Sequence, residues 1–296
     1  MDAGAASAFS VAAPCDDFDG DGRPFGTAWD IGADEQPGSI AGCPAIPVQL
    51  YFSTGGGTLV PGVAAPYDNA DIYSWNGFSF ARVFDASAIP LAGAADIDAL
   101  LVEDSDTFYM SFSTNGGTTV PSPVGTAQDE DIVKYDAGTW SLYFDGSDAG
   151  VDLDDSNDED VDAFEILNGG VIVSTVGDPD VPSITGEQAE DLLKCAGSFG
   201  STTTCTWSFY FDGSDVGLTT PPGGENVDGA SVDGGDLYLT TTGGFTANGS
   251  FSGDNNDVFK CNSVGPGAAT TCSGFSLFFD ASANGISDNI DAIDRP

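Results

Sequence analysis

Four short phrases recur in a fixed order along the chain, and the first of them stands alone at the C-terminus. The first phrase, an acidic or amide residue followed by x-Asp-Ala or x-Asp-Gly, recurs about every 65 residues. Its central aspartates are Asp98, Asp162, Asp228 and Asp291. The second phrase is an apolar run ending in Ser or Thr (49–54, 109–114, 170–175 and 236–241). The third begins with Asp (at 71, 131, 191 and 257), and the fourth is aromatic (from 78, 139, 206 and 275).

Each phrase is a short β-prone run bounded by Gly, Asp, Asn or Pro, which predicts a strand. Repeats of four strands are typical of β-propeller blades. The chain opens with phrases two to four, continues with three full repeats, and ends on phrase one. We therefore predict an all-β, four-bladed β-propeller over 45–296, closed by pairing of the C-terminal strand 290–293 with the first-blade strand 49–54. Closure removes two open sheet edges; the alternative is a longer array that is simply cut short.

The aromatic phrases alternate, so that Trp140, Leu142 and Phe144 are expected on one face of a strand, as are Trp207, Phe209 and Phe211. Apolar residues at a period of two usually face a core. We expect these side chains to pack between blades. The alternative is a surface on which sugars stack.

The cysteines also follow the repeat. Cys195 and Cys205 bracket the loop between the third and fourth strands of one repeat, and Cys261 and Cys272 bracket the equivalent loop of the next. This spacing predicts two hairpin disulfides, because a zinc site would need His or closely spaced Cys ligands. Cys15 and Cys43 remain as a third possible pair. Disulfides indicate an extracellular or cell-surface location.

The charge balance limits the partners of the chain. Six Lys and Arg face 47 Asp and Glu, a net charge of −41. Such a surface excludes a nucleic-acid groove or an anionic membrane surface and favours cations or basic partners. No apolar run reaches the length of a membrane span, which predicts no membrane insertion.

Calcium is the cofactor that this composition favours. Asp17, Asp19 and Asp21 begin like an EF-hand loop, but Ala28 stands where the bidentate Glu belongs. A second possible ligand set is the ring of repeated inner-strand aspartates, Asp98, Asp162, Asp228 and Asp291, around a central channel. Carboxylate oxygens are the ligands that calcium prefers.

Three resemblances add expectations. The wording "FDGSDVGL…ENVDGA" (211–230) and "FDGSDAGV…EDVDAF" (144–164) resembles repeats of large secreted and cell-surface bacterial proteins. At the level of fold, the four "DA"-like phrases are similar to those of hemopexin-like four-bladed propellers, which implies a channel ion. The segment "DFDGDGRPFGTAWDIGADE" (17–35) resembles the closing segment of secreted parallel β-helix domains, where it is structural. It implies that the chain adjoins or derives from a larger surface protein.

Two functions follow from these patterns. The first is a non-enzymatic extracellular structural or adhesive protein, such as a subunit of a surface fibre, self-associating through the N-terminal arm 1–44. The second is a propeller that binds a carbohydrate or another ligand, with a glycan or surface component as partner. An enzyme is not expected, because the chain has no His and no catalytic constellation stands out among its repeats, although paired carboxylates can serve a glycosidase.

Overall fold

The computed structural model describes residues 48–296, apart from 90, 92–94, 114–116, 152–158 and 220–224, and in the first 47 residues only short strands. The chain divides into two compact units, Met1–Pro47 and Val48–Pro296. The first unit contains two small sheets, β1 (Asp2–Gly4) with β4 (Trp29–Asp30) and β2 (Ser7–Ala8) with β3 (Val11–Ala12). Cys15, Cys43, Asp17, Asp19 and Asp21, and most of the predicted self-association arm, lie outside the described residues.

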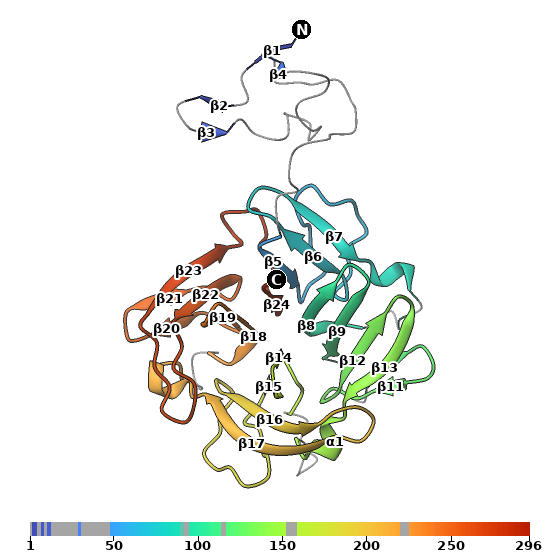
Figure 1. The fold of residues 1–296 in the computed structure, drawn as a ribbon, viewed down its shortest axis with the longest axis vertical. Helices are drawn as coiled ribbons and strands as arrows, with labels where there is room; N and C mark the ends of the chain where they lie inside the picture. The colour runs from blue at the N-terminus through green and yellow to red at the C-terminus, as the bar shows by residue number, and fades with distance from the viewer. Residues whose placement is uncertain are drawn as a thin grey trace. The chain divides into compact units, whose positions relative to one another are not determined.

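The second unit is a four-bladed β-propeller (Figure 1). Blade one consists of β24 (Ala292–Asp294), β5 (Leu50–Ser53), β6 (Ile72–Trp75) and β7 (Phe80–Phe84). Blade two consists of β8 (Ile97–Asp104), β9 (Thr107–Phe112), β12 (Ile132–Asp136) and β13 (Thr139–Phe144). Blade three consists of β14 (Ala163–Leu167), β15 (Gly170–Ser174), β16 (Leu192–Ser198) and β17 (Thr204–Phe211). Blade four consists of β18 (Val227–Asp233), β19 (Asp236–Thr241), β22 (Asp257–Asn262) and β23 (Gly274–Asp280).

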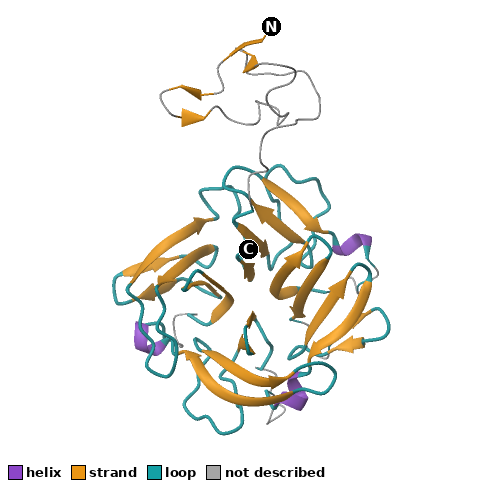
Figure 2. Ribbon diagram, viewed as in Figure 1, coloured by secondary structure: helices purple, strands orange, loops and turns teal. Residues whose placement is uncertain are grey.

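Short hairpins and helical turns lie between the main strands of the blades (Figure 2). Two hairpins, β10 (Thr118–Val120) with β11 (Gly125–Ala127) and β20 (Phe245–Ala247) with β21 (Phe251–Gly253), interrupt blades two and four. One helical turn follows the outer strand of each of the first three blades: η1 (Ala86–Ala88), α1 (Gly146–Ala149) and η2 (Ser214–Val216). No helix within the described residues is long and apolar enough to cross a membrane.

The predicted closure of the ring is confirmed. In β24, Ala292, Ile293 and Asp294 pair antiparallel with Ser53, Phe52 and Tyr51 of β5. The Arg295 guanidinium then donates to the Gln49 carbonyl oxygen (2.7 Å) and forms an ion pair with Asp233 of blade four (3.1 Å). The end of the chain therefore joins the first blade to the last.

The aromatic outer strands pack between blades as predicted, but not all on one face. Trp140 and Leu142 belong to the apolar cluster between blades one and two, whereas Phe144 belongs to the cluster between blades two and three. A β-bulge where β13 pairs with Ile132 and Val133 of β12 causes this switch. Trp140 is 1% exposed, and its equivalent Trp207 is 8% exposed, so these rings do not form a sugar-stacking surface.

Candidate functional site

The four repeated aspartates gather where the inner strands β8, β14, β18 and β24 begin. We call Asp98, Asp162, Asp228 and Asp291 the acid ring; their exposed fractions are 5%, 1%, 6% and 6%. The inner strands contact one another around the propeller axis (Figure 1). The propeller therefore brings together residues that lie about 65 positions apart in the sequence.

Burial and mutual repulsion raise the pKa of every ring acid. Burial is the largest cause in each case. The pKa of Asp98 is raised well above its usual value, with further contributions from the negative charges of Asp160, Asp162 and Asp291. The pKa of Asp228 rises to about 7. Four buried acids thus lie around the propeller axis, and their ionised forms are disfavoured unless a positive charge or a donor compensates them.

A second position, two residues before each ring acid, reaches across to the preceding blade. The Nδ2 group of Asn226 donates to Oδ2 of Asp162 (2.9 Å), and that of Asn289 donates to Oδ2 of Asp228 (2.6 Å). The equivalent residues at the other two blade junctions are Asp96 and Asp160. Two junctions therefore have an amide donor and two have a second carboxylate.

Several ring oxygens have no hydrogen-bond partner. Among the described residues, both carboxylate oxygens of Asp98 and the Oδ1 atoms of Asp162 and Asp291 are buried and unpartnered, and so are the Oδ1 atoms of Asp96 and Asp160 at the position two residues earlier. Buried carboxylate oxygens without donors are costly, and each calls for a proton, an ion or a water molecule. This chemistry fits a hard cation such as calcium, which the composition also favours.

Three residues after the ring position, the inner strands β14 and β24 contain the acids Glu165 and Asp294, whose carboxylates accept hydrogen bonds from neighbouring blades. Oε2 of Glu165 accepts from the Val232 backbone N–H (3.0 Å) and from Oγ of Ser231 (3.1 Å). Oδ2 of Asp294 accepts from the Val102 backbone N–H (2.9 Å), and its Oδ1 lies 3.4 Å from Oγ of Ser231. We call Glu165, Ser231 and Asp294 the inner knot. It joins all four blades through protein groups alone.

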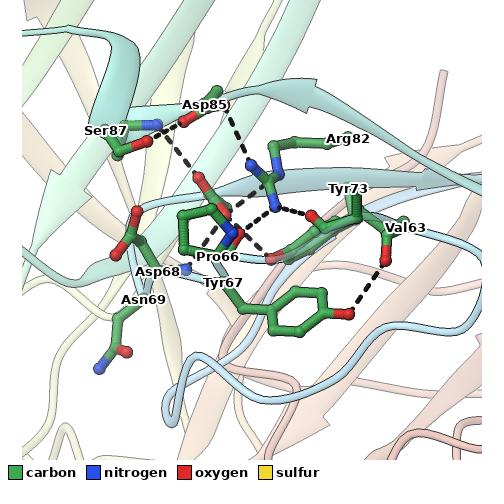
Figure 3. A network of polar contacts seen from close by, with 12 residues as sticks. Val63, Pro66, Tyr67, Asp68, Asn69, Tyr73, Arg82, Asp85 and Ser87 are labelled. Carbon is green, nitrogen blue, oxygen red and sulfur yellow. Dashed lines mark hydrogen bonds and ion pairs between the residues drawn. The ribbon is translucent and has the colours of Figure 1, made fainter.

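A further acidic group lies at the outer side of blade one (Figure 3). Asp68, Asp71 and Asp85 are the one set of described residues whose carboxylate oxygens lie within 4.8 Å of one another, so the ring acids do not converge as tightly. Arg82 already forms ion pairs with two of the three, with Nε 3.2 Å from Asp71 and Nη1 3.0 Å from Asp85, and offsets part of their charge.

The Arg82 network explains a departure from the repeat. Its Nη2 also donates to the carbonyl oxygens of Ala64 (2.7 Å) and Pro66, which ties the loop between β5 and β6 to the outer strand. Arg82 stands where blade two has Leu142. Sequence pattern alone does not explain that difference; in the structure, two carboxylates and two carbonyl oxygens surround the guanidinium and accept its donors.

The aspartates that open the third phrase are structural. Oδ2 of Asp71, Asp131, Asp191 and Asp257 accepts the backbone N–H three residues earlier. Oδ1 of the first three accepts the backbone N–H of Ala86, Gly146 and Gly213, after the outer strand. In the sequence these aspartates stand out only because they recur; their constant position before a strand is the signal that could have identified them as turn-forming residues.

The two predicted hairpin disulfides are present, Cys195–Cys205 and Cys261–Cys272. The loops that they bracket reach the preceding blade. In the first, the Gly200 N–H donates to the Tyr143 carbonyl oxygen (2.7 Å), and Oγ1 of Thr203 accepts from the Asp145 N–H (2.9 Å). Gly267 and Thr270 repeat these contacts in the second loop. Each disulfide therefore supports a contact between neighbouring blades.

Comparisons with known proteins give structural neighbours only. No protein-family model and no curated protein matches the chain. Two similar solved structures are the extracellular domains of a hybrid two-component system and of a one-component system from B. thetaiotaomicron, at 10% and 12% identity, each over 82% of this chain, with TM-scores of 0.30 and 0.31. The chain spans about a third of the length of each, 36% and 35%. The computationally designed Ika8 protein is similar at 9% identity over 77% of this chain and 96% of its own, with a TM-score of 0.25.

Proposed function

We propose that the chain is a non-enzymatic extracellular structural or adhesive module whose propeller is stabilised by calcium at the acid ring. The unpartnered carboxylate oxygens of Asp98, Asp162 and Asp291, buried where the inner strands meet, are the observation that carries this proposal. A cation there offsets the repulsion between the ring acids and supplies the partner that their oxygens lack.

The rest of the propeller supports a structural role. The repeated aspartates of the third phrase make the same turn contact in each blade, and the disulfide loops make the same contact between blades. Disulfides form and persist in oxidising surroundings, which supports an extracellular location. Millimolar calcium concentrations outside cells suit a weak site in an extracellular module.

Thermal unfolding tests the proposal. The full chain is melted in millimolar CaCl₂ and in chelator at equal ionic strength, with MgCl₂ as the control for divalent screening. We expect a higher Tm in calcium than in either control, because only a bound ion stabilises the folded state by mass action. Equal Tm values in calcium, magnesium and chelator would leave salt screening as the whole effect and contradict the proposal.

A further inference from the structure

The four blade junctions at the acid ring have the same geometry of strands, but the residue that faces the ring acid differs among them. At each one, the ring acid of one blade faces the residue two positions before the ring acid of the next. Between blades three and four, and between blades four and one, that residue is Asn226 or Asn289, whose amide donates to the carboxylate of Asp162 or Asp228. At these two junctions the protein itself therefore supplies a donor to one oxygen of the ring acid, although Oδ1 of Asp162 has no partner.

Between blades two and three, the same position is Asp160, which faces Asp98. When both groups are ionised, neither carboxylate can donate a hydrogen bond; only a shared proton gives this junction a counterpart of the Asn contact. Both oxygens of Asp98 and Oδ1 of Asp160 are buried without a partner. Asp98 is only 5% exposed, and the neighbouring charge of Asp162 adds to the repulsion.

The remaining junction, between blades one and two, is intermediate. Asp96 occupies the position before the ring acid, but side-chain hydrogen bonds with Asn69 and Ser113 act to lower its pKa, while burial raises that pKa to about 6. This junction still has two buried oxygens without a partner, Oδ1 of Asp96 and Oδ1 of Asp291. The junction of Asp98 and Asp160 has three, which is the largest number at any of the four junctions.

We propose that a calcium ion bridges the carboxylates of Asp98 and Asp160 and there takes the place that the Asn226 and Asn289 amides fill at their junctions. This inference rests on the proposed calcium function and assigns the ion to one junction rather than to the centre of the ring. It fits the arrangement of the ring, whose acids do not bring three carboxylate oxygens within 4.8 Å of one another. Two facing carboxylates with three free oxygens are a hard-ligand set that calcium, with its tolerance of varied geometry, accommodates.

The equivalent position in another blade suggests a matched pair of substitutions for testing this site, because Asn226 occupies there the place of Asp160. In Asp160→Asn, the new amide should donate to Asp98 as Asn226 does to Asp162. Asn226→Asp places a second carboxylate beside Asp162, as Asp96 and Asp160 already do beside the ring acids of the other two junctions. Asp106→Asn changes the charge equally at an exposed turn between β8 and β9 and serves as the control.

Calcium binding to the full chain is measured by isothermal titration with CaCl₂, and Tm is measured with and without chelator. We expect Asp160→Asn to weaken calcium binding at least about tenfold, the loss that even outer-shell partners of a metal cause. We also expect it to melt higher than the wild type in chelator. Asn226→Asp should melt lower in chelator and gain a larger increase in Tm from calcium. Asp106→Asn should behave like the wild type.

Each outcome separates this inference from the function on which it rests. If the wild type binds no calcium, the proposed function and the site both fail. If the wild type binds calcium and Asp160→Asn binds it equally well, the site is elsewhere and the function stands. If Asp160→Asn does not fold, as judged by circular dichroism, Asn226→Asp decides: an unchanged response to calcium overturns the proposal. A pair that only shares a proton would give Asp160→Asn a higher Tm without any change in the calcium titration, which also overturns it.

Discussion

The acid ring and the inner knot are two levels of buried acids on the inner strands, and the protein treats them differently. All four repeats have an acid at the ring position, whereas three residues later two repeats have an acid, Glu165 or Asp294, and the other two have Leu101 and Ser231. At the inner knot, Glu165 and Asp294 receive backbone N–H groups and the Ser231 hydroxyl. At the acid ring, Asp98 receives nothing within the described residues. Burial of an acid alone therefore does not indicate a binding site, whereas buried carboxylate oxygens without a partner do.

Removing the closing strand should have the largest effect on stability, because the deletion removes one residue of the acid ring and one residue of the inner knot. Deletion of 289–296 removes Asp291, Asp294 and the buried Ile290 and Ile293, and it exposes the edge of β5. We expect a loss of several kcal/mol in the free energy of unfolding, the scale of lost buried apolar side chains. Urea denaturation followed by fluorescence measures it. A deletion that unfolds at the same urea concentration as the full chain would show that the ring is not closed by this strand.

The pH dependence of the knot should be the next largest effect. Burial raises the pKa of Glu165 from 4.5 to about 7, so the folded state binds this proton more tightly than the unfolded state. The group's contribution to stability is therefore most favourable below about pH 4.5 and declines as pH rises to about 7, by up to about 3 kcal/mol.

Glu165→Gln removes the titration, but its NH₂ group must face the Ile166 or the Val232 backbone N–H, which carries a cost that does not depend on pH. We therefore expect the free energy of unfolding of the variant, measured in chelator, to rise relative to that of the wild type between pH 5 and pH 8. Asp106→Asn, at an exposed turn, is the control for net charge. A wild type and a Gln variant with parallel pH profiles would mean that donors in the knot already hold Glu165 ionised.

A smaller effect should follow from removing one donor of the knot. Oγ of Ser231 lies 3.1 Å from Glu165 and 3.4 Å from Asp294, and it accepts from the Arg295 N–H (3.0 Å). Its single proton serves one carboxylate at a time. Ser231→Ala should cost about 1–2 kcal/mol, because a buried N–H and a buried carboxylate lose a partner.

Ser105→Ala, at an exposed turn, is the matched control for Ser231→Ala, and chemical denaturation compares the two. Equal stability of both variants would show that the backbone N–H groups alone hold the knot together. The calcium response of Ser231→Ala should stay that of the wild type, since the substitution leaves the acid ring intact.

Repeat spacing was sufficient to predict the strands, the number of blades and the closing pair, because one phrase at the end fits one gap at the beginning. It also predicted the hairpin disulfides from Cys195, Cys205, Cys261 and Cys272. The spacing failed at the faces of the outer strands: alternation places Phe144 beside Trp140, but a bulge turns it to the next blade. Bulges insert a residue without a clear sequence mark.

The recurrence of an aspartate at one position of every repeat can be read directly from the amino-acid sequence. Which of the aspartate oxygens have a hydrogen-bond partner depends on the folded propeller, because each partner comes from the next blade. In the repeat, Asn226 and Asn289 occupy the same position as Asp96 and Asp160. In the folded propeller, the two Asn side chains donate a hydrogen bond to the ring acid of the preceding blade, which an ionised Asp cannot do. The same holds for Arg82, whose acceptors lie in a loop that precedes its strand. Strand identity depends on local pattern, whereas compensation of buried charge depends on neighbours that folding brings from distant positions.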